Sequence, residues 1–215
     1  MSAHILLVHG LGRTPLSLAR LARALRRDGH RTHTIGYVAG IEPFDRIVTR
    51  VRDALAALLR EPAPVVAVTH SLGGVLVRAA LAHEPPLPRL PDHVVMLAPP
   101  NQPPRLARRL HRLWPYRVIN GDVGQRLADP GFLEALPPIP VPHTIIAGTA
   151  GPTGRFSPFG DLPNDTVVAV EETRPTPDTP VIELPVYHTF LMNDARVRAV
   201  IRTVLAGVAD PAPTT

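Results

Sequence analysis

Ser71 is the residue whose surroundings best suit chemistry. It follows the β-branched run Val65 to Thr69 and His70, and it precedes Leu72, two glycines and a helix-like segment. A buried strand that ends in a sharp turn before a helix lifts a serine hydroxyl clear of the strand's carboxyl end, and glycines let helix and strand approach closely. The usual pattern is Gly-x-Ser-x-Gly, and Thr69 stands at its first position here. Serine is also a common helix N-cap, so other residues must decide between the two roles.

A nucleophilic serine needs a base to take its proton and a carboxylate to hold that base in the right tautomer. In a parallel sheet with this turn, the partners follow later strands in the order serine, acid, histidine. His188 directly follows the last predicted strand and Asp165 lies between the last two strands. We therefore predict a triad of Ser71, Asp165 and His188. The rival carboxylates are Asp161, Asp178 and Asp194, of which Asp161 is the serious alternative and Asp194 suits the N-cap of the final helix.

A glycine-rich turn follows the first predicted strand, in Leu6-Leu7-Val8-His9-Gly10-Leu11-Gly12. The turn lacks the full glycine spacing of a dinucleotide-binding loop. We predict instead that the backbone N–H groups of Leu11 and Leu72 form an oxyanion hole. Such donors each contribute about 3 to 4 kcal/mol in the transition state.

The composition excludes several other kinds of site. The 215 residues include no cysteine, which rules out disulfides, thiolate catalysis and cysteine-ligated metals. His30 and His33 have a spacing found in metal sites, but no third ligand lies nearby, so we predict neither a metal nor another cofactor. The 23 basic residues are all arginine, the formal net charge is +5 and aromatic residues make up 4%. Nucleic-acid binding needs stacking aromatics among the basic residues, so no nucleic-acid partner is predicted.

Length and hydropathy set the organisation of the chain. The 45% hydrophobic content suits a single α/β domain over residues 1–210, and residues 211–215 are expected to form a disordered tail. The segment from Met1 to Gly10 has no positively charged leader and only a short apolar run. Neither a signal peptide nor a membrane-spanning helix is predicted, and we expect a cytoplasmic protein.

Short apolar runs alternate with longer segments of helical periodicity, which is typical of βαβ units and a mainly parallel sheet. Six strands are predicted, at His4–His9, Arg31–Tyr37, Pro64–Thr69, His93–Ala98, His143–Gly148 and Val181–Val186. Four helices are predicted, at Pro15–Arg27, Phe44–Leu59, Leu72–Ala82 and Ala195–Val208. Residues 101–142 interrupt the alternation and are too long for an ordinary connection, so we predict a lid-like insertion over the sheet.

The insertion carries an amphipathic helical pattern. One face holds Arg105, Arg108, Arg109 and Arg112, and the other holds leucines that lead into Trp114. We predict that Leu106, Leu110 and Trp114 line the substrate site. The arginines indicate either an ordinary solvated face or a peripheral contact with a membrane surface.

Together these motifs resemble α/β-hydrolase fold enzymes of the lipase and esterase branch, over nearly the whole chain. The likeness is closest to compact bacterial lipase-like proteins, through His9-Gly10-Leu11-Gly12, Thr69-His70-Ser71, Leu97-Ala98-Pro99-Pro100-Asn101 and His188-Thr189-Phe190-Leu191. The resemblance implies a reduced sheet that begins at the oxyanion strand. In such proteins an Asn-Asp pair before a valine-rich strand carries the triad acid, which favours Asp165 over Asp161.

Three departures from that pattern bear on substrate range and on the shape of the lid. Thr69 replaces the first glycine of the turn, Thr166 stands where lipases often have glycine, and Gln102-Pro103-Pro104 follows Asn101 in place of Gly-Ser. The resemblance implies a serine hydrolase that cleaves small-molecule or lipid carboxylic esters through an acyl-enzyme. Thioesterase, amidase or acyltransferase activity on the same triad stays open, as does a non-catalytic binding protein with the hydrolase shape.

Overall fold

The computed structural model describes residues 2–209, and at positions 116 and 117 it describes the backbone alone. Within these residues, six strands form one sheet in the order β2-β1-β3-β4-β5-β6, and every neighbouring pair is parallel. The strands are β1 His4–Val8, β2 Arg31–Ile35, β3 Val65–His70, β4 His93–Leu97, β5 His143–Gly148 and β6 Ile182–Leu184. The predicted six-stranded α/β sheet is confirmed. The predicted tail, 211–215, lies outside the described residues.

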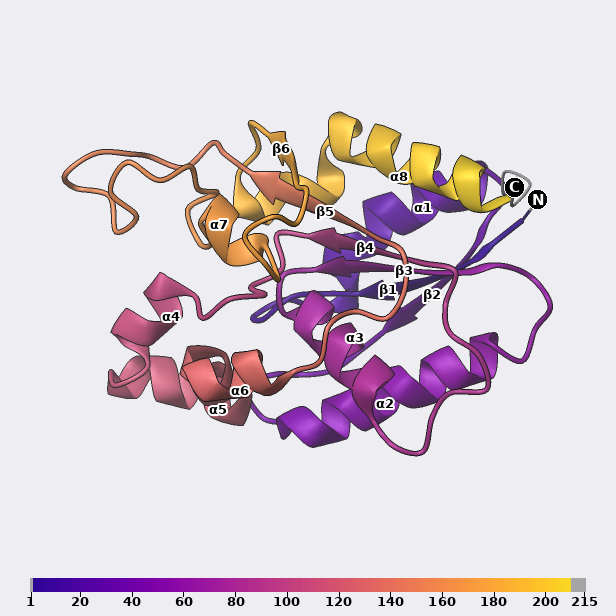
Figure 1. Cartoon of the computed structure of the whole chain (residues 1–215), viewed down its shortest axis with the longest axis horizontal. Coiled ribbons are helices and arrows are strands. Elements are labelled where there is room, and N and C mark those ends of the chain that lie inside the picture. Colours follow the sequence, from indigo (N-terminus) through magenta and orange to yellow (C-terminus); the bar gives the residue numbers. More distant parts are fainter. Residues whose placement is uncertain (1, 210–215) are drawn as a thin grey trace.

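Helices cover both faces of the sheet (Figure 1). The helices α1 (Ala19–Arg27) and α8 (Ala195–Ala209) pack on one face, and α2 (Phe44–Leu58) and α3 (Leu72–Ala82) pack on the other. The helices α1, α2 and α8 show apolar residues at helical spacing and bury one stripe against the sheet, whereas α3 is buried on nearly all sides. The two resulting hydrophobic cores enclose the strands from both sides.

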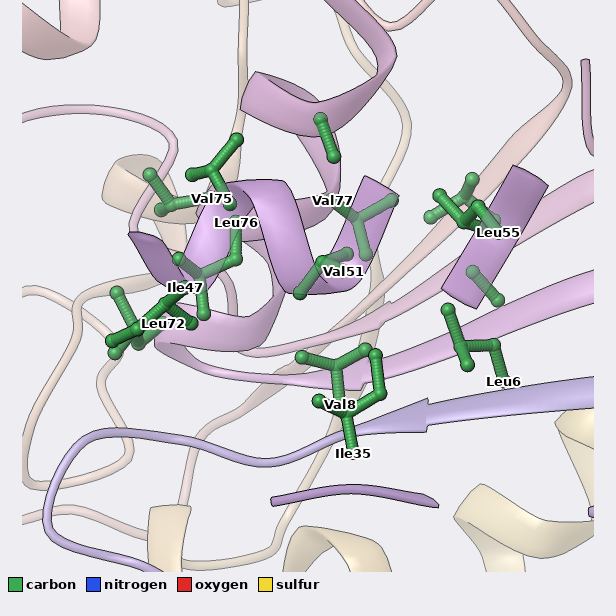
Figure 2. Close-up of a cluster of buried hydrophobic side chains, with 14 of the residues drawn as sticks. Leu6, Val8, Ile35, Ile47, Val51, Leu55, Leu72, Val75, Leu76 and Val77 are labelled. Carbon is green, nitrogen blue, oxygen red and sulfur yellow. The ribbon is translucent and has the colours of Figure 1, made fainter. Parts of the chain in front are cut away.

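The central strands are buried on both faces, which explains why they read as continuous apolar runs. Successive strand residues point to opposite faces, so Leu6 and Val8 of β1 join the core under α2 and α3, while Leu7 joins the core under α1 and α8. Figure 2 shows Leu6 near Leu55 of α2 and Val8 beside Ile35 of β2, with Leu76 of α3 in the same cluster. The strand ends that carry the candidate site are therefore held by a closely packed interior.

Residues 101–142 leave β4 and return to β5 through α4 (Arg105–Leu110), α5 (Trp114–Ala128) and α6 (Pro130–Ala135), which lie beyond the carboxyl ends of the strands (Figure 1). Polar contacts attach α5 to the start of α2. The Asp122 carboxylate accepts a hydrogen bond from the main-chain N–H of Phe44 at 2.9 Å, and Arg126 forms an ion pair with Asp45 at 2.7 Å. The insertion is thus tied to the main body on the α2 side.

Several element ends differ from the sequence prediction. Pro15–Leu18 is a 3-10 turn (η1) that precedes α1, and His188, predicted in a loop, begins a second 3-10 turn (η2) at His188–Asn193. The strand β6 is shorter than predicted because it pairs with β5 alone at the sheet edge and ends before Pro185, which has no N–H to donate. Among residues 2–209, no helix has the length and apolar character that crossing a membrane requires.

Candidate active site

Ser71 lies in a strained turn between β3 and α3. Its backbone has φ 52° and ψ −122°, a conformation that costs a non-glycine residue about 1 to 3 kcal/mol. The main-chain N–H of Ser71 donates to the carbonyl oxygen of Leu97 at 2.8 Å, which holds the turn against the end of β4. Within the described part of the chain, the Ser71 side chain makes no capping hydrogen bond to α3. The alternative role as an ordinary N-cap is therefore not used, and the hydroxyl is left for other contacts.

Gly73 is required by the close approach of α3 to β1. A Cβ atom at this position would lie 2.4 Å from the carbonyl oxygen of Val8 and 2.9 Å from that of His9. Thr69, which stands where the usual pattern has glycine, is fully buried, and its hydroxyl donates to the carbonyl oxygen of Val95 at 3.3 Å. The threonine is therefore accommodated inside the sheet without opening the turn.

His188 and Asp165 form a buried hydrogen-bonded pair. The His188 Nδ1 lies 2.6 Å from Asp165 Oδ2, and the main-chain N–H of His188 donates to the carbonyl oxygen of Asp165 at 2.9 Å. The other carboxylate oxygen, Oδ1, accepts the main-chain N–H groups of Val167 at 3.0 Å and Val168 at 2.8 Å. With its carboxylate oxygens engaged, Asp165 holds the proton of His188 on Nδ1 and leaves Nε2 free to act as a base.

The structure brings Asp165, and not Asp161, to the histidine. Asp161 is exposed on the loop before the pair. Asn164 is fully buried, and its Oδ1 accepts the main-chain N–H of Thr166 at 3.0 Å while its Nδ2 donates to the carbonyl oxygens of Pro152 and Leu162. Thr166 has φ 89°, in the left-handed region that favours glycine. Asn164 thus fixes the turn that presents Asp165.

His70 contacts the candidate base from the side of the nucleophile. Its Nε2 donates to the main-chain carbonyl oxygen of His188 at 3.0 Å, and the two imidazole rings lie 4.8 Å apart between centroids. Burial, followed by the nearby His188, holds the pKa of His70 well below its usual range. His70 is therefore a neutral ring with its proton on Nε2. The sequence alone does not reveal this contact, because a hydrogen bond across 118 positions leaves no local signal.

His9 supports the glycine-rich turn after β1. Its Nδ1 donates to the carbonyl oxygen of Gly10 at 2.9 Å, and its ring stacks on Tyr37 with centroids 3.9 Å apart. A Cβ atom on Gly10 would lie 3.1 Å from the Cβ of Ser71, so this glycine lets the turn approach the nucleophile. Leu11 lines the same pocket as Ser71, and Leu72 opens α3, where the first N–H groups of a helix have no partner within it.

One pocket, of about 250 Å³, contains Ser71 and His188. The insertion supplies an apolar part of its wall through Leu106, Ala107, Leu110 and Leu127, and the loop after Asp165 supplies Val167 and Val168. Two of the three predicted substrate-binding residues, Leu106 and Leu110, therefore lie beside the candidate nucleophile.

Trp114 lies elsewhere, which corrects the prediction that it lines this pocket. Its side chain is 75% exposed and lines a separate surface hollow with Val118 and Gln125. The physical reason is that α4 ends at Leu110, so Trp114 begins a second helix and does not continue the leucine face of the first.

Arg105 is exposed, as expected for a solvated arginine face, and it also contacts two glutamates. Its guanidinium forms an ion pair with Glu171 at 2.5 Å, and its main-chain N–H donates to Glu172 at 2.7 Å. Glu172 is buried, and this burial raises the pKa of its carboxyl despite the two main-chain N–H groups that it accepts. Asn101 donates to the carbonyl oxygen of Thr173 at 2.8 Å. The start of the insertion is therefore attached to α7 (Val170–Thr173), directly after the loop of the candidate acid.

The other three arginines gather on the outer side of the insertion. Arg108, Arg109 and Arg112 line one groove together with His111 and Gln125. Within residues 2–209, none of the three arginines forms an ion pair with a carboxylate.

The described range 2–209 holds no group of three histidine, aspartate or glutamate side chains that could bind a metal ion. His30 accepts the main-chain N–H of Ala3 at 3.3 Å, and His33 stacks on His4 with ring centroids 5.2 Å apart. Both histidines therefore have contacts of their own, His30 just before β2 and His33 in the middle of that edge strand.

The sequence matches one protein family, and the fold matches solved structures. A family model described as "Alpha/beta hydrolase family" matches residues 5–213. No curated protein matches the sequence significantly. Many solved structures are similar in fold.

Three of these solved structures are lipolytic or esterase proteins. The mature form of the Bacillus licheniformis lipase BlEst2 has a TM-score of 0.76 at 18% identity, with 95% of this chain and 92% of that chain covered. The metagenomic carboxyl esterase MGS0156 has a TM-score of 0.71 at 19% identity, with 97% and 76% covered. A structure from a study of the metagenome-derived lipolytic enzymes LipS and LipT has a TM-score of 0.68 at 16% identity, with 97% and 95% covered. Identities this low show a shared fold and no more.

Proposed function

Because the chain belongs to the alpha/beta hydrolase family, we propose that it is a serine hydrolase that cleaves carboxylic esters through a covalent acyl-enzyme. The observation that carries the proposal is the 2.6 Å contact between His188 Nδ1 and the buried Asp165 Oδ2, with His188 lining a pocket that also contains Ser71. This arrangement orients an imidazole in the same pocket as a strained serine. The lipase and esterase names of the structural neighbours support the choice of esters.

In the proposed reaction, His188 Nε2 takes the proton of Ser71 as the hydroxyl oxygen attacks the ester carbonyl carbon. The negative charge that develops on the carbonyl oxygen is held by the main-chain N–H groups of Leu11 and Leu72. The tetrahedral intermediate then collapses, the C–O bond to the alcohol breaks, and His188 gives its proton to the leaving oxygen. A water molecule, activated by the same histidine, attacks the acyl-enzyme and releases the acid. Asp165 keeps His188 in the required tautomer throughout.

Labelling with a fluorophosphonate probe tests the nucleophile directly. The wild-type protein is expected to form a covalent adduct, and Ser71→Ala is expected to abolish it. Ser2→Ala is a matched control, because Ser2 is exposed and its hydroxyl donates to the carbonyl oxygen of Gly29, away from the pocket. Retention of the adduct in Ser71→Ala would overturn the proposal.

Ester hydrolysis is distinguished from its alternatives by substrate profiling. Thioesters, amides and acyl transfer to an alcohol use the same triad, so turnover of matched ester, thioester and amide substrates ranks them. A non-catalytic binding protein would show no turnover of 4-nitrophenyl butanoate above that of Ser71→Ala.

We also propose that the outer surface of the insertion contacts anionic membranes. The groove of Arg108, Arg109 and Arg112, which Asp129 also lines, shares Gln125 with a hollow lined by the exposed Trp114 and Val118. Basic and apolar side chains on one surface suit the interface of an anionic bilayer.

The test is co-sedimentation with vesicles of phosphatidylglycerol and phosphatidylcholine. Replacing Arg108, Arg109 and Arg112 by glutamine is expected to lower binding to anionic vesicles, and added salt is expected to weaken the binding of the wild type. The matched control replaces three exposed arginines of α1, Arg20, Arg23 and Arg27. An equal loss in both triple variants would contradict a specific role for the insertion.

A further inference from the structure

Arg13 is the one residue with a permanent charge among the described residues that line the pocket of Ser71. It stands two positions after Leu11, in the turn that follows β1, and it is half-buried. Most of the remaining wall is apolar, with Leu106, Ala107 and Leu110 from the insertion. A single guanidinium in such a wall interacts strongly with a charged ligand, because electrostatic interactions are stronger where water is partly excluded.

The contacts of Arg13 leave most of its donors unused. Its Nη2 donates to the hydroxyl of Thr189 at 2.9 Å. Within residues 2–209, no carboxylate lies within ion-pairing distance of Arg13, and Thr189 is its one side-chain partner. A guanidinium carries five N–H donors in a planar fork that matches carboxylate and phosphate groups.

Other arginines of this protein show how it engages a guanidinium when the role is structural. Arg78 donates to the carbonyl oxygens of Pro137 and Leu136, and Arg50 forms an ion pair with Glu42 at 2.5 Å. Each of these side chains has several protein acceptors. Arg13 has one, and its free donors face a pocket that a ligand must enter.

The position of Thr189 indicates which part of a substrate lies near Arg13. Thr189 directly follows His188, and His188 must deliver its proton to the oxygen of the leaving alcohol. The alcohol part of an ester therefore lies on the histidine side of Ser71, where the hydrogen bond to Thr189 holds the guanidinium. The apolar wall from the insertion is left for the acyl chain.

We propose that Arg13 determines specificity by binding a carboxylate or phosphate group on the alcohol part of the ester substrate. The inference rests on the proposed esterase function and names its substrate class: esters with an apolar acyl chain and an anionic alcohol. The charge of Arg13 acts at this catalytic centre. The pKa of His70 is lowered chiefly by burial and by His188, and the positive charge of Arg13 lowers it further.

A purely structural role for Arg13 makes a different prediction. If Arg13 only held Thr189 and thereby oriented His188, its loss would slow neutral and anionic esters by the same factor. The ratio of their kcat/KM values separates the two roles, since orientation of His188 cancels in that ratio.

The experiment compares hydrolysis of 4-butanoyloxybenzoate with that of its neutral methyl ester. The wild type is expected to prefer the anionic ester, and Arg13→Gln is expected to lower the preference ratio about 10- to 100-fold, the range of a hydrogen bond to a charged group. Arg13→Lys is expected to keep part of the preference, because the charge remains without the fork. Arg20→Gln on exposed α1 is the matched control and should leave the ratio unchanged. An unchanged ratio in Arg13→Gln would overturn the proposal.

Two further arms complete the test. The same comparison with 4-butanoyloxyphenyl phosphate shows whether carboxylate or phosphate is the better match for the guanidinium. Calorimetric binding of 4-hydroxybenzoate to Ser71→Ala, with and without Arg13→Gln, needs no turnover. If no ester is hydrolysed, the proposed function fails, yet a loss of 4-hydroxybenzoate binding on Arg13→Gln would still support the anion site. Equal binding by both variants would overturn it.

Discussion

The imidazole of His70 donates from Nε2 to the main-chain carbonyl oxygen of His188 at 3.0 Å. The residue before the candidate nucleophile thus holds the backbone of the candidate base. Both side chains are buried, and the low pKa of His70, caused first by burial, keeps its ring neutral beside His188. A neutral ring can orient the candidate base without opposing the positive charge that the proposed mechanism places on His188.

Loss of this hydrogen bond is expected to slow catalysis more than it weakens binding. His70→Phe keeps a buried ring but cannot donate, so His188 moves and kcat falls about 10- to 100-fold. His70→Gln can donate from its amide to the same oxygen and should recover part of that loss. Ester turnover and the rate of fluorophosphonate labelling measure both variants, with circular dichroism as a check of folding. Full turnover in folded His70→Phe would show that the contact is unimportant.

The sequence predicted the fold well because buried parallel strands have a strong local signal. The apolar runs at β1, β3 and β4 are buried on both faces, so each is visible without knowledge of its neighbours. The prediction was less accurate for strands at the edge of the sheet. The strand β6 has neighbours on one side only and spans three residues, which periodicity could not limit in advance.

The candidate site was predictable where order along the chain sufficed, and less so where it depended on contacts. Ser71 and His188 followed from motif order, Asp165 was preferred to Asp161 through the family resemblance, and the structure places Asp165 and His188 in hydrogen-bonding contact. The surroundings of Trp114 depend on where α4 ends, and those of Arg105 depend on its ion pair with Glu171. Local sequence patterns show neither of these features. The position of Arg13 in the pocket could not be predicted for the same reason, since its partner Thr189 lies 176 positions away in the sequence.

Asp165→Asn is expected to lower kcat by about 10⁴, while the fold is kept. The amide would donate to His188 Nδ1, which places the imidazole proton on Nε2 and removes the base. Asp161→Asn is the matched control, since Asp161 is exposed and should tolerate the change. Steady-state turnover of 4-nitrophenyl butanoate measures both variants. If Asp161→Asn were inactive and Asp165→Asn active, the triad acid would be Asp161 and not Asp165.

Asp194 is expected to stabilise the fold in a pH-dependent way. Its carboxylate accepts the main-chain N–H of Arg196 at 2.8 Å in the first turn of α8, as the sequence predicted for an N-cap. The side-chain hydrogen bond with Arg196 comes first among the causes that lower the pKa of Asp194 to about 2 from its usual 3.8. Because the folded pKa is the lower one, the stabilisation is present above pH 3.8 and is lost as the pH falls towards 2.

Urea unfolding of Asp194→Ala measures this contribution. We expect a loss of about 1 kcal/mol at pH 7, the usual value for an N-cap, with little added by the exposed ion pair. The difference from the wild type should shrink as the pH falls from about 4 towards 2, because the unfolded chain then binds a proton at Asp194 while the carboxylate of the folded protein stays ionised. Asp194→Asn keeps an oxygen acceptor but does not titrate, so its stability relative to alanine should vary less with pH. A difference that stays constant with pH would contradict the role of the charge.

Gly73→Ala and Gly207→Ala are expected to change stability in opposite directions. A Cβ on Gly73 would meet the carbonyl oxygens of Val8 and His9, which are backbone atoms of the buried sheet and cannot move aside. The variant should lose about 2 kcal/mol or more and should also displace the neighbouring Ser71. Gly207 lies within α8 with no atom within 4 Å of the added carbon, so alanine should stabilise that helix by about 0.5 to 1 kcal/mol. Thermal unfolding together with fluorophosphonate labelling separates the two sites: Gly73→Ala should lose stability and labelling together, whereas Gly207→Ala should gain stability with labelling unchanged. A stable, fully labelled Gly73→Ala would mean that α3 does not need its close contact with β1 to present the nucleophile.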